Sequence, residues 1–527
     1  MKKKYVRWTL WTIASPFILF IILCILIYLP PIQNFLVDKA AVYASEATGM
    51  NISVGRISLS FPLNLVVTDV DAASPHNDTL LSVRRLQVNV QLLPLLKKQV
   101  EVDGISLQGA TVNSNDLIHG MKLNGTLGEL FISSHGVALD PETAIVNKVL
   151  LKDTDLSLCL NDTAAADTAA SDTAYWKIIL QDIDLQNVSF ALDMPLDSLS
   201  LAASLDNAIL RDGLIDLHKS AYSLQTFRIE NGRVRYDNGK PLAADSLSSG
   251  LDPSHIALTD IGVKLDSLYY GGRNMKAIIS QFVLKERSGV EIVSATGRMV
   301  SNDKVLRVPS LKLETRDSYL ELNAAMDWNA LDFKDEGLVS ARLMADIGKP
   351  DVVRFMGSMD EKFIRQYPSE PLRIRTGIDG DLNKLKLTTL TAELPGALGL
   401  FARGELTHLT DSLLRGGDIT LEAETKDLKF VSTLAEGIEI PYGTRLEGKF
   451  TMAGTKMGTD LLLMQPEAQA VVAADTIPIT VYNDSISVAD DFKMERAARL
   501  FAKYDLSRDR YEADLAVNHF DLHQFMP

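Results

Sequence analysis

Few side chains in this sequence have the types and spacing that carry catalysis. His519 and His523 are four residues apart, a spacing that places two imidazoles on one helix face and suits a metal ion. They lie in VNHFDLHQF, which alternates as a strand does, so we expect no metal site there. The sequence also lacks a nucleophile elbow, a phosphate-binding loop, a dinucleotide fingerprint and a CxxC pair. It therefore predicts a protein that is not an enzyme and has no cofactor or metal.

The net charge of the chain limits the kinds of molecule that it could bind. The chain has 527 residues and a net charge of −15, which argues against nucleic acid, because a nucleic-acid partner requires a basic surface. The two cysteines, Cys24 and Cys159, lie in apolar stretches, and we interpret them as small buried residues rather than as a disulfide. The length exceeds that of one ordinary core, so several domains or a repeat array are expected.

The first hundred residues predict a membrane anchor and the start of a folded region. Residues 1–7 carry four basic side chains, and residues 8–29 contain no charge over about 33 Å of helix. This pattern predicts a single-pass anchor with a cytoplasmic N-terminus and the bulk of the chain across the membrane. A cleaved signal peptide is the alternative, although the apolar run is long for one. Residues 30–100 are then expected to form a short helix, up to Gly49, followed by the first strands.

Most of residues 101–527 is predicted to be repetitive β-structure in which the alternation of apolar residues slips by one. In DIDLQNVSFAL, Ile183 and Leu185 alternate in one phase, and Val188 and Phe190 alternate in the other. A bulge that absorbs one residue would return both halves to one face of the sheet. Gly, Asp and Asn tolerate the backbone that such a bulge needs. The copies of the motif place these bends at Gly109, Asp153, Asn187, Asn207 and Asn231.

A sheet bent at the same place in unit after unit would form a trough lined with aliphatic side chains. At about 11 residues per strand, the residues after Gly49 would form about 40 strands, with about 4.8 Å between neighbours. The pattern fits an open, U-shaped, solenoid-like groove, and it equally fits a closed β-sandwich filled with side chains. The residues expected to line the groove are Ile105, Leu107, Val112, Leu151, Leu156, Ile183, Leu185, Phe190, Leu205, Leu210, Ile229 and Val234.

One segment interrupts the strands. Residues 161–174, NDTAAADTAASDTA, are poor in bulky apolar side chains and predict a flexible surface loop whose deletion has little effect on stability. Its Asp-Thr-Ala triplets also resemble an O-glycosylation signal, although Asp-Thr and Asp-Ser are ordinary turn sequences as well.

The basic flank, the apolar run, SEATGMNISVGRISLSFP and LNLVVTDVDA resemble the start of proteins of the AsmA/TamB family. FRIENGRVRYD, LRIRTGIDGDLNKLKL and YDLSRDRYEADLAVNHFDLHQF resemble the strand repeats of TamB, so the resemblance covers nearly the whole chain. The family implies an inner-membrane-anchored β-groove that crosses the periplasm. It implies phospholipid as cargo and, for TamB, assembly of outer-membrane proteins with a β-barrel partner. The domain that docks on this barrel in the family has no counterpart before HQFMP, so the chain resembles an N-terminal fragment or a short relative.

Two functions remain open at this point. One is a non-catalytic conduit that carries phospholipid toward the outer membrane or supports outer-membrane protein assembly. The other is a periplasmic scaffold or binding protein whose repeats are closed β-sandwiches. Glycan binding usually needs exposed aromatic rings, and beyond the predicted anchor the chain has only two tryptophans, Trp176 and Trp328.

Overall fold

The computed structural model describes a large part of the chain. The described residues are 41–42, 45, 50–60, 64–74, 79–90, 102–114, 120–139, 142–161, 176–239, 250–333, 337–356, 361–434, 440–466, 494–518 and 520. The predicted anchor (8–29) and the segment 162–174 lie outside them. In the described part of the chain, no helix is long and apolar enough to span a membrane. Ala41, Val42 and Ser45 are helical and fall within the helix expected before Gly49.

The described residues are mostly β-structure, which confirms the predicted fold class at that level. They form 24 strands, and the chain divides into two compact units. The first unit comprises residues Met1–Pro241 and Ser254–Gly271, and the second comprises Leu242–Pro253 and Gly272–Pro527.

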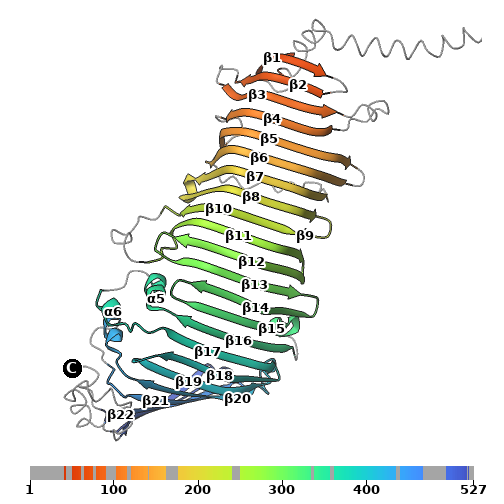
Figure 1. The fold of residues 1–527 in the computed structure, drawn as a ribbon. Coiled ribbons are helices and arrows are strands. Elements are labelled where there is room, and N and C mark those ends of the chain that lie inside the picture. The colour runs from red at the N-terminus through yellow and green to blue at the C-terminus, as the bar shows by residue number, and fades with distance from the viewer. Residues whose placement is uncertain are drawn as a thin grey trace, which may run out of the picture. The chain divides into compact units, whose positions relative to one another are not determined.

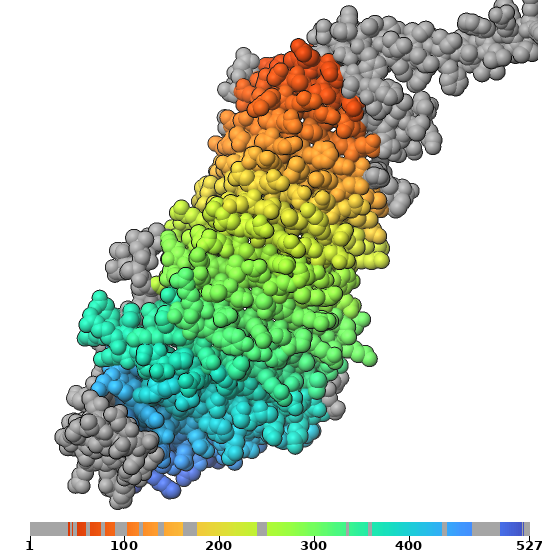
Figure 2. All heavy atoms as spheres, viewed as in Figure 1, coloured from red at the N-terminus to blue at the C-terminus, as the bar shows by residue number. Residues whose placement is uncertain are grey.

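The first unit is a layer of strands that lie side by side in chain order (Figure 1). Several strands have 18 or 19 residues, so the predicted length of about 11 residues was wrong for them. In the space-filling view the successive strands appear as adjacent bands from red to yellow-green (Figure 2). The strands of this unit are β1 (Asn51–Ser60), β2 (Asn64–Ala73), β3 (Thr79–Val90), β4 (Val102–Asn113), β5 (Met121–Leu139), β6 (Glu142–Leu160), β7 (Lys177–Met194), β8 (Leu199–Asp216), β9 (Ala221–Leu224), β10 (Thr226–Asp237) and β11 (His255–Gly271).

Neighbouring strands of the first unit are antiparallel except at one pair. Strands β6 and β7 run parallel, with Thr143 opposite Lys177 and Cys159 opposite Asp193. The short β9 pairs with both β8 and β11, in line with β10. A 3-10 turn, η1 (Pro195–Asp197), joins β7 to β8. Because β6 and β7 are parallel, residues 161–176 connect opposite ends of this pair, which the sequence pattern does not indicate.

The second unit is an antiparallel meander in which each strand pairs with the next. Its strands are β12 (Asn274–Glu286), β13 (Glu291–Ser301), β14 (Val305–Thr315), β15 (Tyr319–Asp327), β16 (Leu338–Ile347), β17 (Leu372–Asp381), β18 (Lys384–Leu394), β19 (Leu398–Thr407), β20 (Gly416–Thr425), β21 (Arg445–Ala453), β22 (Lys456–Pro466), β23 (Met494–Asp505) and β24 (Arg510–Val517).

Short helices of the second unit pack at the ends of its strands. They are α4 (Trp328–Leu331), α5 (Lys349–Met356), α6 (Glu361–Gln366) and the 3-10 helix η2 (Lys429–Thr433). Phe363 of α6 is 2% exposed and packs with Tyr367 and Phe430, at ring centroid distances of 5.5 and 5.7 Å. Burial raises the pKa of Tyr367. At the other end of β16, Ala330 of α4 packs with buried Val339. The well-packed cores of this unit therefore lie at the strand ends.

A buried carboxylate fixes α5 to the turn between β14 and β15. Asp351 is 1% exposed and accepts hydrogen bonds from the hydroxyls of Thr315 and Ser318, the latter at 2.6 Å. Arg354 donates to Asp351 Oδ1 at 3.0 Å and to Asp317 Oδ2 at 3.0 Å. These bonds satisfy a charge that would otherwise be costly to bury, and they make the position of α5 specific.

Candidate functional site

A line of unpaired positions crosses the first unit from strand to strand, and we call it the crease. In each pair of adjacent strands from β1 to β8, the cross-strand pairing skips one residue on each strand, and the two skipped residues lie opposite each other. They are Gly55, Asp69, Arg84, Gly109, Gly128, Asp153, Asn187 and Asp206. The ladder between β8 and β10 is interrupted at the same level, beside Asn231. The phase slips inferred from single strands are thus one continuous feature of the sheet. The predicted bulge was wrong in form, because from β1 to β8 each strand of a pair skips one residue and the register does not shift there.

The residue types along the crease follow from backbone conformation. Gly109, Asp153, Asn187 and Asn231 have positive φ angles of 63°, 49°, 52° and 53°, as does Asp69 at 55°. Gly, Asp and Asn are the residues that adopt this left-handed conformation at least cost. The predicted positions of the unusual backbone conformation are therefore confirmed at four of five residues.

The fifth predicted bend, Asn207, was wrong. Asn207 pairs regularly with Gln186 on one side and with Glu230 on the other. Its neighbour Asp206 occupies the crease instead and accepts a hydrogen bond from the Asn231 amide. The sequence could not separate these two residues, because both are turn-forming types and only the register with β7 distinguishes them.

Close contact explains the glycines of the crease. A Cβ atom on Gly128 would lie 2.8 Å from the Cβ of Asp153, and one on Gly55 would lie 3.0 Å from the Cβ of Asp69. At these two positions a left-handed residue on one strand directs its Cβ at the glycine of the neighbouring strand, so a larger residue has little room there. Arg84 and Asp206 occupy the corresponding positions on β3 and β8.

Apolar side chains form continuous rows on both sides of the crease. The row beside it, which we call the central row, pairs Leu107 with Leu130, Leu130 with Leu151 and Leu151 with Leu185. Every member is aliphatic from β1 to β11: Ile57, Val67, Leu86, Leu107, Leu130, Leu151, Leu185, Ala208, Ile229 and Val263. The side-chain period of two thus gives the sheet one apolar face that runs across the strands.

The structure places all twelve predicted lining residues in such rows. Leu107, Leu151, Leu185 and Ile229 belong to the central row. The next row away from the crease contains Ile105, Ile183 and Leu210. Across the crease, Leu205 lies in the first row, and Val112, Leu156, Phe190 and Val234 lie in the second.

The rows are only partly buried. All four predicted members of the central row have intermediate exposure, and Ile105 and Phe190 are 36% and 38% exposed. The adjacent residues Gln108, Lys152, Gln186 and Glu230 are exposed. A side chain inside a packed sandwich would be almost inaccessible, as Phe363 is in the second unit. Among the described residues of the first unit, every strand belongs to this one layer, and none forms a second sheet over the rows.

The second unit has a mainly apolar row that the sequence analysis did not identify. It runs through Leu311, Leu322, Leu343, Thr376, Leu390, Ala402, Leu421, Gly448, Leu461, Leu500 and Leu515. Strands β15 and β16 keep strict alternation, whereas β14 and β18 each carry a register shift, between Val308 and Leu311 and between Leu387 and Leu390. A search for alternation alone, as in SYLELNAAMD, would have found strands such as β15.

Charged pairs join neighbouring strands on the opposite face of the second unit. Arg375 and Asp346 are 2.6 Å apart, and Lys384 and Glu405 are 3.2 Å apart. On β15, Tyr319 donates a hydrogen bond to Glu321 at 2.8 Å, which raises the pKa of Tyr319 and lowers that of Glu321. Because these ion pairs and this hydrogen bond lie on a solvated surface, each contributes little to stability.

No cluster of three or more potential metal ligands occurs in the part of the chain that the structure describes. His519 and His523 lie outside that part. Cys159 is on β6, with intermediate exposure and a free thiol. No protein-family model matches the sequence, and no curated protein does. The likeness to the AsmA/TamB family accordingly depends on the motifs quoted above.

Proposed function

We propose that this chain is a non-catalytic carrier of phospholipid, with the acyl chains lying along the apolar rows of the sheet. The observation that carries this proposal is the partial exposure of the central row, in which only Val67 and Ala208 are buried. Uncovered apolar surface costs about 25 cal/mol per Å² relative to a covered state. A contiguous apolar surface of this kind usually marks a binding site.

The length and the aliphatic composition of the central row favour a lipid ligand over a protein side chain or a sugar. The central row crosses ten strands, and at about 4.8 Å per step it extends over about 43 Å. Its members are aliphatic throughout, so they offer no hydrogen bond that would fix a ligand in one place. A chain of methylene groups needs only such non-directional contacts. A glycan would need aromatic and polar partners instead.

We further propose that the crease bends the sheet into an open, U-shaped groove rather than a closed sandwich. The intermediate exposure of Leu107, Leu151 and Leu185 supports this, because a filled interior would exclude water from them. A sandwich-type scaffold would require the whole central row to be buried, whereas only Val67 and Ala208 are.

The cellular setting is part of the same proposal. The basic flank, the uncharged segment 8–29 and the resemblance to the AsmA/TamB family support an inner-membrane anchor with the β-structure in the periplasm. In that place the protein would carry phospholipid toward the outer membrane or support outer-membrane protein assembly.

Site-specific photocrosslinking in the intact cell envelope tests the carrier function. A crosslinker replaces Leu107, Leu151, Leu185 and Ile229 in turn, and the matched controls are Gln108, Lys152, Gln186 and Glu230, each one residue further along the same strand. We expect phospholipid adducts at the aliphatic positions and at least about fivefold fewer at the controls, because successive side chains point to opposite faces. Equal labelling of the two sets would contradict the proposal.

A further inference from the structure

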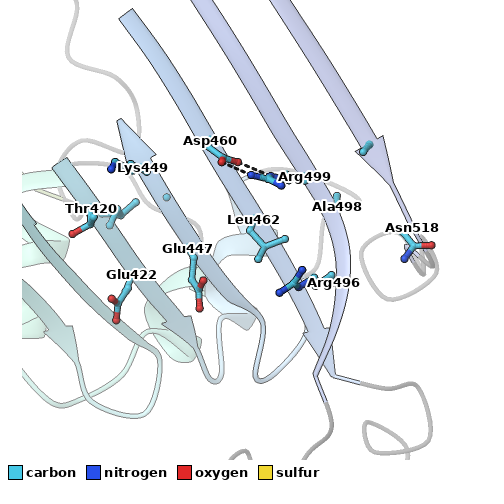
Figure 3. Close-up of a pocket in the computed structure, with 13 residues that line it drawn as sticks. Thr420, Glu422, Glu447, Lys449, Asp460, Leu462, Arg496, Ala498, Arg499 and Asn518 are labelled. Carbon is cyan, nitrogen blue, oxygen red and sulfur yellow. Dashed lines mark hydrogen bonds and ion pairs between the residues drawn. The ribbon is translucent and has the colours of Figure 1, made fainter. Parts of the chain in front are cut away.

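A hollow of about 520 Å³ lies over strands β20–β24 of the second unit (Figure 3). Most of its lining side chains come from the face opposite to the apolar row, since Leu421 pairs with Gly448 while Glu422 pairs with Glu447. The hollow is therefore separate from the rows to which we assign lipid.

One side of the hollow is acidic. Glu422 and Glu447 are direct partners in the antiparallel pair of β20 and β21, where opposing Cβ atoms are about 4.5–5.5 Å apart. Both side chains are exposed, and within the described residues neither forms an ion pair. Like charges in this position are unfavourable, so the pair attracts a cation.

The other side of the hollow carries a basic group that has no ion pair among the described residues. Arg499 is not that group, because it donates two hydrogen bonds to Asp460, the first from Nε to Oδ1 at 2.7 Å. This pairing lowers the pKa of Asp460 and raises that of Arg499. Arg496 lines the hollow as well, is exposed, and has no ion pair in the described part of the chain. In Figure 3 the amide of Asn518 lies on the same side.

Apolar atoms separate the two charged sides. Leu462 pairs with Glu447 on one side and with Arg499 on the other, and Arg496 pairs with Met464, two residues further along the same strand. The side chain of Leu462 therefore lies between Glu447 and the strand that carries Arg496. Ala498 and Ala516 complete this floor. From one side of the hollow to the other, the lining groups are acidic, then apolar, then basic.

We propose that the hollow binds a small zwitterion of the phosphoethanolamine type. A primary ammonium has three donors, enough to bridge the carboxylates of Glu422 and Glu447. A phosphate suits the guanidinium of Arg496, which offers paired donors. The two-carbon linker contacts Leu462. A cation alone leaves Arg496 unpaired, and an anion alone leaves the two glutamates opposed, so only a ligand with both charges satisfies the site. The same group occurs free in solution and as the head of phosphatidylethanolamine.

Isothermal titration of the full chain in detergent with O-phosphoethanolamine tests the site. We expect saturable binding that weakens at least tenfold in Glu447→Gln and in Arg496→Gln. Phosphocholine, which lacks N–H donors, should bind at least tenfold more weakly to the native protein. The control is Glu405→Gln, whose carboxylate pairs with Lys384 away from the hollow and whose removal should leave the binding unchanged.

Short-chain phosphatidylethanolamine, used below its micellar concentration, identifies the source of the ligand. Tighter binding than that of O-phosphoethanolamine assigns the site to a lipid headgroup, and weaker binding assigns it to a free zwitterion. Equal binding of inorganic phosphate or of Ca²⁺, or unchanged isotherms for both variants, would overturn the zwitterion site. The lipid adducts expected in the first unit are independent of this result, so the two proposals fail separately.

Discussion

Asn187 of β7 donates a hydrogen bond from Nδ2 to Oδ1 of Asp153 on β6 at 2.9 Å, and both residues have a left-handed backbone. They are 34 positions apart in the chain and occupy the same level of the crease. The side chain that permits the unusual backbone conformation on each strand thus also joins the two strands. Asn and Asp therefore stabilise the crease in two ways, because they tolerate its left-handed backbone and because their side chains form a hydrogen bond between the strands.

Asn187→Val should destabilise the first unit. A β-branched residue at φ 52° is strained, and the amide bond to Asp153 is lost, so we expect a cost of about 1–3 kcal/mol. A lower melting temperature by differential scanning calorimetry would show it.

Two variants serve as controls for this prediction. Asn187→Gly keeps the left-handed backbone and should cost clearly less than Asn187→Val. Asn207→Val places the same residue at a regularly paired position and should change the melting temperature little. If both valine variants behave alike, backbone conformation is not what selects Asn187.

Deletion of residues 162–174 should disrupt the first unit, contrary to what composition alone suggests. Leu160 and Lys177 lie at opposite ends of the parallel pair, which at about 3.3 Å per residue is more than 50 Å long. The three residues left between them cannot cover that distance. We expect loss of cooperative unfolding by calorimetry and increased proteolysis.

A Gly/Ser segment of the same length is the matched control for the deletion. It should preserve the melting temperature to within about 2 °C, because length and not sequence is required. A deletion variant as stable as the native chain would contradict the parallel pairing.

Leu185→Asp should fold and yet lose lipid contact. On an uncovered face the carboxylate stays hydrated, so the melting temperature should fall by only a few degrees, whereas burial without water would cost several kcal/mol. With a crosslinker at Leu151, its partner across the strands, lipid adducts should fall at least about fivefold. Gln186→Asp is the control and should leave the adducts unchanged. An aggregated Leu185→Asp protein would favour a filled sandwich instead.

The Asp460–Arg499 pair should stabilise the second unit in a pH-dependent way. The hydrogen bonds from Arg499 hold the pKa of Asp460 below its ordinary value of 3.8. The contribution is therefore present above about pH 4 and is lost as pH falls through the lower folded pKa. Asp460→Asn should melt about 1–2 °C lower at neutral pH, and this difference should vanish near pH 2. A difference that persists at low pH would show that the charge pair is not its cause.

Glu447→Gln should raise stability in the absence of ligand. It removes the repulsion from Glu422, which is worth about 0.2–1 kcal/mol, so the melting temperature should rise by about 1–3 °C at low salt. The gain should shrink at 1 M salt because the charges are screened. A lower melting temperature would mean that Glu447 has a stabilising partner.

The sequence by itself predicted the β-class and the residues that share a face. Both follow from local physics, since alternation with period two marks a strand and only a few residue types accept a left-handed backbone. Gly109, Asp153, Asn187 and Asn231 were found for that reason. The placement of Leu107, Leu151, Leu185 and Ile229 in a common row follows from the same pattern.

Tertiary structure decided everything that depends on which strand lies next to which. It chose Asp206 over Asn207 for the crease, because cross-strand register is not encoded in either residue. It made β6 and β7 parallel, a choice of partner that no local motif expresses. It set Glu422 opposite Glu447, although 25 positions separate them. It also left most side chains of the aliphatic rows partly exposed. Alternation tells which face of a strand is apolar, but only the packing of whole layers determines whether that face is covered.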